Sequence, residues 1–183
     1  MPANLTPLEP SPSDVLLTGD PRRAFALAQA LMVQPKMSHQ ARGLWGYTGV
    51  TAGGSDLGVQ ATGVGGPGAA AVLGDLAGFG VKRAIRLGSC VSPADEHAPG
   101  EVLLVESAIG RDGASSSTTG GDSPLRPDSG LNGLLGDIAP RVTVSSHDFV
   151  ARFDPDGPMP GPGASVRDLQ TAATFAIRRS AHR

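Results

Sequence analysis

Short apolar runs that end in glycine-containing turns recur along this sequence, and they constrain its fold more than any other feature. The first run, Val15–Leu17, is followed by a Gly-Asp-Pro turn in which Asp20 suits a helix N-cap and Pro21 the first helical position. The run 57–62 meets the glycine-rich stretch 63–68, after which a helix of small residues is expected. Strands that alternate with helices in this way predict an α/β fold.

The rest of the pattern extends this alternation to the end of the chain. We expect strands at 15–17, 45–50, 57–62, 83–87, 102–109 and 142–145, and helices at 22–32, 69–77, 131–138 and 166–179. We expect residues 1–13 to form a flexible arm, residues 14–183 to form one domain, and the Gly-, Ser- and Thr-rich segment 111–130 to be mobile.

Composition and charge exclude several classes of protein. A net charge of −2 and a pI near 6.0 provide no basic stripe, so no nucleic-acid partner is expected. No apolar run approaches the roughly 20 residues of a membrane span, and the polar N-terminus lacks the apolar core of a signal peptide. A single cysteine, Cys90, permits no internal disulfide. One cysteine suits a reducing compartment, so with no signal peptide and no membrane span we expect a cytoplasmic protein. The four histidines have no metal-ligand spacing, so no metal is expected.

Arg86 is the most unusual residue of the predicted strands, because it lies in an otherwise apolar run. A guanidinium in such a place is either an anion clamp or half of a structural ion pair. Ligands of α/β sheets bind beyond the carboxyl ends of strands. Gly19 and Ser89 both follow predicted strands, and Arg23 lies in the first turn of a predicted helix. These residues predict an anion site.

Several motifs, in a fixed order and spacing, point to one family. They are Gly19-Asp20-Pro21-Arg22-Arg23, Arg42-Gly43, TGVGGPGAAAVLGDLAGFGVKRAIRLGSC (62–90), PGEVLLVESAIGRDGAS (99–115), Ser145-Ser146, and a weaker Asp168-Leu169-Gln170-Thr171-Ala172. From about Val15 to Ile177 the sequence resembles the trimeric and hexameric nucleoside phosphorylases, and it is most similar to the uridine phosphorylase branch. The resemblance implies a mixed, largely parallel central sheet flanked by helices.

The resemblance also implies a reaction and a phosphate site. In this family, phosphate cleaves the N-glycosidic bond of a nucleoside, giving a base and a pentose 1-phosphate, with phosphate as co-substrate and no cofactor. Phosphate would be bound by the Gly19 backbone, Arg23, Arg86 and Ser89. Arg42 matches an arginine that reaches the site from a neighbouring subunit, which implies a homodimer, often assembled into a hexamer.

The sugar and base regions depart from the family pattern. The family has Glu-Met-Glu where this chain has Asp168-Leu169-Gln170, so Gln170 keeps a hydrogen-bonding oxygen but loses a negative charge. By resemblance, Leu169 and Gln170 contact the sugar, Phe149 stacks on the base, and Arg86 and Gln170 are the catalytic residues. Family members continue through a further strand and helix that assist the leaving base, so we expect a C-terminally shortened form.

Three activities are consistent with this pattern. The first is an active phosphorylase for uridine or a related nucleoside. The second is a non-catalytic homologue that binds phosphate or a sugar phosphate, or that serves assembly. The third is a nucleosidase in which water replaces phosphate; it is disfavoured because related hydrolases generally lack the phosphate arginines.

Overall fold

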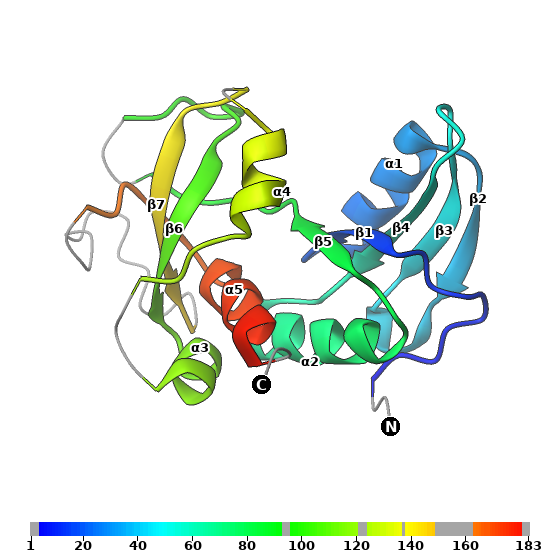
Figure 1. Ribbon diagram of the computed structural model, residues 1–183, viewed down its shortest axis with the longest axis horizontal. Helices are drawn as coiled ribbons and strands as arrows, with labels where there is room; N and C mark the ends of the chain where they lie inside the picture. Colours follow the sequence, from blue (N-terminus) through cyan, green and yellow to red (C-terminus); the bar gives the residue numbers. More distant parts are fainter. Residues whose placement is uncertain (1–3, 93–95, 121–123, 137, 149–162, 181–183) are drawn as a thin grey trace. The chain divides into compact units, whose positions relative to one another are not determined.

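The computed structural model describes residues 4–92, 96–120, 124–136, 138–148 and 163–180. These residues form an α/β fold that divides into two compact units (Figure 1). The first unit comprises the described residues of Met1–Val64 and Gly68–Gly88, and the second those of Gly65–Pro67 and Ser89–Arg183. The expected class, a mixed and largely parallel α/β fold with flanking helices, is confirmed, but the described strands form two sheets rather than one.

The first unit is built on a five-stranded mixed sheet. Its strands are β1 (Asp14–Thr18), β2 (Met32–His39), β3 (Gly46–Thr51), β4 (Asp56–Ala61) and β5 (Arg83–Arg86), in the spatial order β2-β3-β4-β1-β5. β1 pairs in parallel with both β4 and β5, whereas β3 pairs antiparallel with both β2 and β4. Helix α1 (Pro21–Leu31) follows β1, helix α2 (Gly65–Gly78) follows β4, and the 3-10 turn η1 (Ala41–Gly43) joins β2 to β3.

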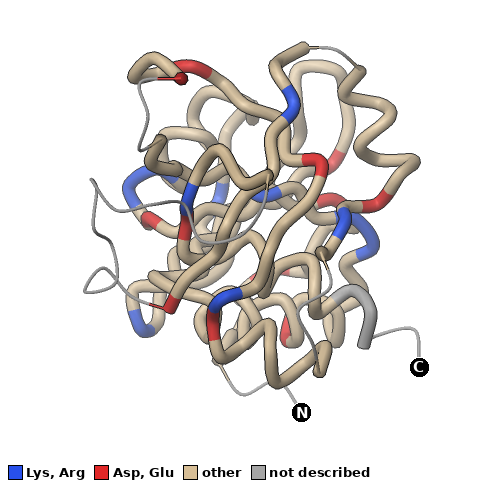
Figure 2. The backbone as a smooth tube through the Cα atoms, turned by 90° about the vertical axis from the view of Figure 1, so that its left-hand side faces the viewer, with Lys and Arg blue, Asp and Glu red and all other residues tan. Residues whose placement is uncertain are grey.

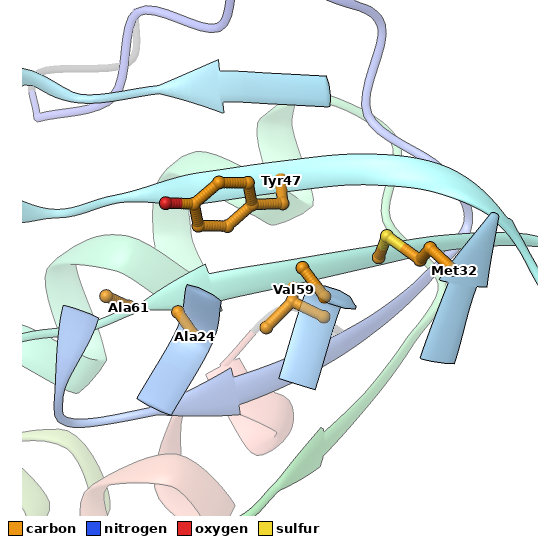
Figure 3. Packing of buried hydrophobic residues seen from close by; sticks show 6 residues of the cluster. Ala24, Met32, Tyr47, Val59 and Ala61 are labelled. Atoms are coloured by element: carbon orange, nitrogen blue, oxygen red, sulfur yellow. The ribbon is translucent and has the colours of Figure 1, made fainter. Parts of the chain in front are cut away.

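Alternate residues of β1 face two different cores. Leu16 packs against a cluster from α1, β2, β3 and β4 (Figure 3), whose buried members are Ala24, Ala28, Met32, Tyr47, Val59 and Ala61. Val15 and Leu17 pack instead with Val72 and Leu76 of α2. Because successive side chains of a strand point to opposite faces, α1 covers one face of this sheet and α2 the other.

Most elements of the first unit lie where the sequence predicts them, but β2 does not. The sequence predicts a helix through Met32 and no strand after it, whereas β2 begins at that residue. Its burial does not alternate, because the pairing with β3 shifts register between Val33 and Lys36. Pro35, which has no N–H, and Gln34, with a φ of 53°, lie at this irregularity. Because the alternation of buried and exposed residues is broken, the sequence pattern does not indicate this edge strand.

Residues 4–8 differ from the flexible arm that we expected. Leu5 is only 3% exposed and packs in the core beside Val15 and Leu17. The backbone N–H of Leu8 donates to the Ser38 carbonyl at 2.7 Å. A single buried leucine and a few backbone hydrogen bonds fix this segment, although its composition is rich in proline and polar residues.

The second unit is built on a three-stranded parallel sheet. Its strands are β6 (Leu104–Arg111), β7 (Arg141–His147) and β8 (Val166–Asp168), and β7 pairs with both of the others. Its helices are α3 (Gly113–Thr119), α4 (Ser129–Leu134) and α5 (Thr171–Ser180). Helix α5 contacts α3, β6 and β7, and its Ala172 and Ala176 form a buried cluster with Ala108 of β6.

Two expectations for the second unit are wrong. Helix α3 lies in the segment 111–130, which we expected to be mobile, because Asp112 caps this helix and its packing against α5 outweighs a weak Ser/Thr-rich helix propensity. The helix expected at 166–179 begins only at Thr171, because residues 166–168 pair with β7 as a strand. Most of the Pro- and Gly-rich stretch 154–165 lies outside the described residues.

Lys and Arg positions are interspersed with Asp and Glu positions along the described backbone (Figure 2). None of the described helices is long and apolar enough to cross a membrane. Within the described ranges, no group of three or more His, Cys, Asp or Glu side chains is arranged to hold a metal ion. In α/β sheets of this kind, ligands bind beyond the carboxyl ends of the parallel strands.

Candidate functional site

The carboxyl ends of β4, β1 and β5 lie side by side at one edge of the first sheet. The backbone N–H groups of Thr62, after β4, and Leu87, after β5, each donate to a β1 carbonyl at 2.8 Å. The segments that follow the three strands therefore leave the sheet at the same edge. Gly19 follows β1 directly, and Arg86 is the last residue of β5. Two of the sequence-predicted phosphate residues thus lie at the end of adjacent strands, at the edge where open α/β sheets bind ligands.

Helix α1 begins at the same edge, two residues after Gly19. The exposed Asp20 caps it by accepting a hydrogen bond from the Arg22 N–H at 2.8 Å. Arg23 is exposed in the first turn of this helix. The partial positive charge of a helix N-terminus and an arginine side chain therefore occur together here, and both favour an anion.

Arg86 is half-buried, and its guanidinium lies against the backbone of Gly88. A Cβ added to Gly88 would overlap Nη1, Cζ and Nη2 of Arg86, so a glycine is needed to leave room for this conformation. An apolar run of this length suggests a buried strand, but among the described strands β5 pairs only with β1, and it is half-exposed. The guanidinium therefore folds back over the chain that follows its own strand.

The other arginine of β5 forms a structural ion pair. Arg83 donates to Asp14 through Nε to Oδ1 and through Nη2 to Oδ2, both at 2.5 Å. This hydrogen bonding lowers the pKa of the Asp14 carboxyl, with a smaller Coulombic contribution, and partial burial opposes it. Asp14 and Arg83 are paired residues at the start of β1 and β5, at the opposite end from Arg86. The strand thus carries one arginine at each end, and Arg83 forms an ion pair with Asp14.

Arg42 lies in η1, exposed and with a left-handed backbone at a φ of 57°. Its Nη1 donates to Asn4 Oδ1 at 3.3 Å. The turn leads into β3, whose first residue, Gly46, pairs with Gln60 near the carboxyl end of β4. Arg42 therefore lies at the carboxyl edge of the sheet on the β4 side, whereas Arg86 lies on the β5 side.

The remaining expected site residues belong to the second unit. Ser89 is exposed, and Leu169 is half-buried just after β8. Gln170 is 3% exposed, and its Nε2 donates to the Gly65 carbonyl at 3.2 Å. A glutamate could not donate this hydrogen bond, so the amide suits its surroundings. Phe149 lies outside the described residues. The roles of all four in binding stay predictions.

Sequence reasoning missed a buried polar network at the start of α5. The Asp168 carboxylate, 4% exposed, accepts hydrogen bonds from Ser146 Oγ and from Thr171 Oγ1, both at 2.5 Å. Ser146 Oγ in turn accepts from the Ala172 N–H at 2.9 Å. An aspartate just ahead of a helix was the available signal, since such residues satisfy the first N–H groups of helices.

Two further aspartates end the neighbouring strands β6 and β7 in the same manner. Asp112, 1% exposed, accepts from the Ser115 N–H at 2.8 Å and from Ser115 Oγ at 2.6 Å. Asp148 Oδ1 accepts from the Gly113 N–H at 2.8 Å. A Cβ on Gly66 would lie 2.7 Å from Asp112 Oδ1, so this glycine serves close packing. The carboxylates at this edge therefore hold the starts of α3 and α5.

Comparisons with known proteins identify the family of this fold. The family model described as Phosphorylase superfamily matches residues 14–158, more than half of the chain. The chain belongs to the phosphorylase superfamily. Among its relatives are two proteins named purine nucleoside phosphorylase DeoD-type, from Oceanobacillus iheyensis (36% identical over 95 residues) and from Clostridium novyi (34% identical over 164 residues). The resemblance to nucleoside phosphorylases that the motifs carry is thereby confirmed.

The matches cover a larger share of this chain than of the relatives. The two matches cover 51% and 89% of this chain, but only 40% and 63% of the respective relatives. The chain thus spans about two fifths to two thirds of the length of these relatives.

Solved structures share the fold at low sequence identity. A uridine phosphorylase from Vibrio fischeri ES114 has a TM-score of 0.81 at 23% identity, covering 93% of this chain and 74% of that one. A purine nucleoside phosphorylase from Toxoplasma gondii, in complex with immucillin-H, has a TM-score of 0.78 at 20% identity, covering 93% and 73%. Both kinds of phosphorylase are represented among these relatives, so the comparisons do not favour the uridine branch.

Proposed function

We propose that this protein is a nucleoside phosphorylase, which uses inorganic phosphate to cleave the N-glycosidic bond of a nucleoside into a free base and a pentose 1-phosphate. One observation carries the proposal: Gly19, Arg23 and Arg86 occur at one carboxyl edge of the first sheet, beside the N-terminus of α1. Membership of the phosphorylase superfamily supports it.

Phosphate is held at this edge by charge and by directed hydrogen bonds. The Gly19 N–H and the N-terminal end of α1 face the anion, and the guanidinium groups of Arg23 and Arg86 each donate paired hydrogen bonds to its oxygens. The Ser89 hydroxyl adds a donor. Arg42 reaches the phosphate of a neighbouring subunit, so the working form is a homodimer or a larger homo-oligomer. These contacts position the nucleophile, which accounts for a large share of catalysis in such displacements.

The reaction itself exchanges one bond for another at the anomeric carbon. A phosphate oxygen forms a bond to that carbon while the carbon–nitrogen bond breaks, and the bonding pair leaves with the base, which takes up a proton. Leu169 and Gln170 contact the sugar, Gln170 through its amide oxygen, and Phe149 stacks on the base. Arg86 is the catalytic residue of the phosphate end, because it touches the attacking group. Phosphate is the co-substrate, and the reaction needs no further cofactor.

The base is the least constrained part of the proposal. Uridine is the first nucleoside to test, because the order of the N-terminal motifs resembles the uridine phosphorylase branch. Purine nucleosides come next, because both named sequence relatives are purine nucleoside phosphorylases.

The test is base release from a panel of pyrimidine and purine nucleosides, with and without phosphate, followed by chromatography. Wild-type protein should release base only when phosphate is present, and Arg86→Ala should lose most of this phosphate-dependent release. Arg83→Ala is the matched control, because it removes the same side chain from the other end of the same strand. Unchanged turnover in Arg86→Ala, or release that ignores phosphate, contradicts the proposal.

A second candidate is a non-catalytic homologue that binds phosphate or a sugar phosphate. It is favoured by Gln170, a buried amide that donates to the Gly65 carbonyl at a position where the family has an acidic residue. Calorimetric binding of phosphate without base release from any nucleoside supports this candidate, and robust turnover rules it out.

A further inference from the structure

A buried carboxylate anchors the N-terminal segment (residues 4–8) to the first unit. Asp75 of α2, 8% exposed, accepts hydrogen bonds at Oδ2 from the backbone N–H groups of Asn4 at 2.7 Å and Leu5 at 2.9 Å. The Leu5 side chain is buried directly beside this anchor, against Val72 and Leu76 of the same helix. Charge-assisted hydrogen bonds of this kind are about twice as strong as neutral ones, so the start of the segment is held firmly.

The rest of the segment is attached to the end of β2. The Thr6 N–H donates to His39 Nδ1 at 3.1 Å, and His39 is 2% exposed. The Leu8 N–H donates to the Ser38 carbonyl at 2.7 Å. These attachments leave the backbone of the segment little freedom, so its side chains start from fixed backbone positions.

One of these side chains meets Arg42. Asn4 Oδ1 accepts a hydrogen bond from Arg42 Nη1 at 3.3 Å. Arg42 is exposed on a 3-10 turn of three residues, and its backbone is left-handed. An exposed arginine otherwise samples many rotamers, and binding an anion has to overcome that entropy.

We propose that the N-terminal segment positions Arg42 for phosphate, with Asn4 as the positioning residue and Asp75 as the anchor that fixes Asn4. The inference rests on the proposed function, because only there is Arg42 assigned to phosphate. Asn4 touches no reacting atom. It limits the guanidinium to directions that are compatible with its hydrogen bond, so less freedom is lost when phosphate binds.

The experiment is a double-mutant cycle on phosphate affinity, measured by calorimetry with inorganic phosphate and the full chain. Asn4→Ala removes the acceptor but keeps the backbone N–H that binds Asp75, and it should raise the Kd about two- to fivefold, as expected for one long hydrogen bond. In an Arg42→Ala background the same substitution should leave the Kd unchanged, because Asn4 acts only through Arg42. Asn132→Ala, the same change in α4 of the second unit, is the matched control and should bind as wild type does.

A second variant tests the anchor without any ligand. Asp75→Ala should speed hydrogen exchange at the amides of Asn4 and Leu5, whereas Asp75→Asn, which keeps an acceptor oxygen, should give an intermediate rate. Asp75→Ala should also raise the Kd for phosphate at least as much as Asn4→Ala does. Unchanged exchange in Asp75→Ala overturns the anchor.

The outcomes separate this inference from the function on which it rests. If wild type binds phosphate and Asn4→Ala binds equally well, the positioning role is overturned and the proposed function stands. The same holds if Asn4→Ala weakens binding equally with and without Arg42, because that result marks a general structural defect. If wild type binds no phosphate, the proposed function falls, and this inference falls with it.

Discussion

The two units end their parallel strands beside helix N-termini, but they use these edges differently. In the first unit Arg23 and Arg42 are exposed at the edge and Arg86 is half-buried there, and the cap residue Asp20 is itself exposed. In the second unit Asp112 and Asp168 are at most 4% exposed and accept hydrogen bonds from helix N–H groups and from hydroxyls. A helix end that holds a buried carboxylate of its own chain has no need of an external anion, whereas an edge with accessible cations favours one.

This contrast predicts that substitutions at the two edges affect different properties of the protein. Substitutions at the arginine edge should change phosphate binding and leave folding intact. Substitutions at the aspartate edge should change folding first.

The largest effect is expected at Asp168. Asp168→Ala leaves Ser146, Thr171 and the start of α5 without their common acceptor, and the free energy of unfolding should fall by about 3 kcal/mol, as for other buried hydrogen-bonded charges. Urea denaturation measures this fall. Asp56→Ala removes an exposed aspartate of β4 and should change the unfolding free energy little. Equal losses in the two variants would break the contrast between the edges.

The next effect is expected at Arg86. Arg86→Ala should lower kcat/KM for phosphate about 100-fold, because it removes paired hydrogen bonds to the attacking group. Arg86→Lys keeps the charge but not the planar fork, so its kcat/KM should be intermediate. The urea midpoint should stay close to that of wild type in both variants. Steady-state kinetics over a range of phosphate concentrations measures the effect, and a large stability loss without a kinetic loss would assign Arg86 to the structure instead.

A smaller effect is expected at Gly88, which contacts the guanidinium of Arg86. Gly88→Ala displaces this guanidinium while retaining its charge, and the KM for phosphate should rise about tenfold, less than the roughly 100-fold that a 1 Å misplacement can cost. Gly53→Ala is the control, because its added Cβ would meet only Thr51 Oγ1, at 3.8 Å. An unchanged KM in Gly88→Ala would show that the position of the guanidinium does not matter.

The smallest effect concerns the ion pair between Asp14 and Arg83. Hydrogen bonding to Arg83 lowers the pKa of Asp14 below its ordinary value of 3.8, so the stability from this pair is present above that pH. It is lost as the pH falls through the folded-state pKa. The difference in unfolding free energy between wild type and Asp14→Asn should therefore be small at pH 7 and vanish in strong acid, because the pair is solvent-exposed. Urea titrations at several pH values measure it, and a difference that grows in acid would contradict this assignment.

Much of the first unit could be predicted from the sequence because its signals are local. Asp20 and Pro21 mark the start of α1, and the Gly-rich turns mark the ends of β1 and β4. The elements that could not be predicted depend on distant partners. β2 is an edge strand whose period is broken near Pro35, and β8 is a strand of three residues that exists because β7 pairs with it. Leu5 is buried by residues far along the chain.

In the candidate site, too, some residues could be predicted from local signals and others depend on distant partners. Gly19, Arg23 and Arg86 could be found from motifs because each follows or ends a recognisable strand or helix signal. The hydrogen bond of Gln170 to Gly65 joins residues that are 105 positions apart, and no local pattern indicates it. The same is true of the pairing between Ser146 and Asp168, which lie on neighbouring strands. Local sequence signals thus indicate where the arginines lie. The partners of the buried polar residues depend on hydrogen bonds between distant parts of the chain.

The most direct test of the account is a calorimetric titration of inorganic phosphate into wild type, Arg86→Ala and Arg83→Ala. Wild type and Arg83→Ala should bind phosphate with the same Kd, and Arg86→Ala should lose most of this affinity while its urea midpoint is preserved. Phosphate binding that survives Arg86→Ala, or wild-type protein that binds no phosphate, would contradict the assignment of the first sheet's carboxyl edge as an anion site.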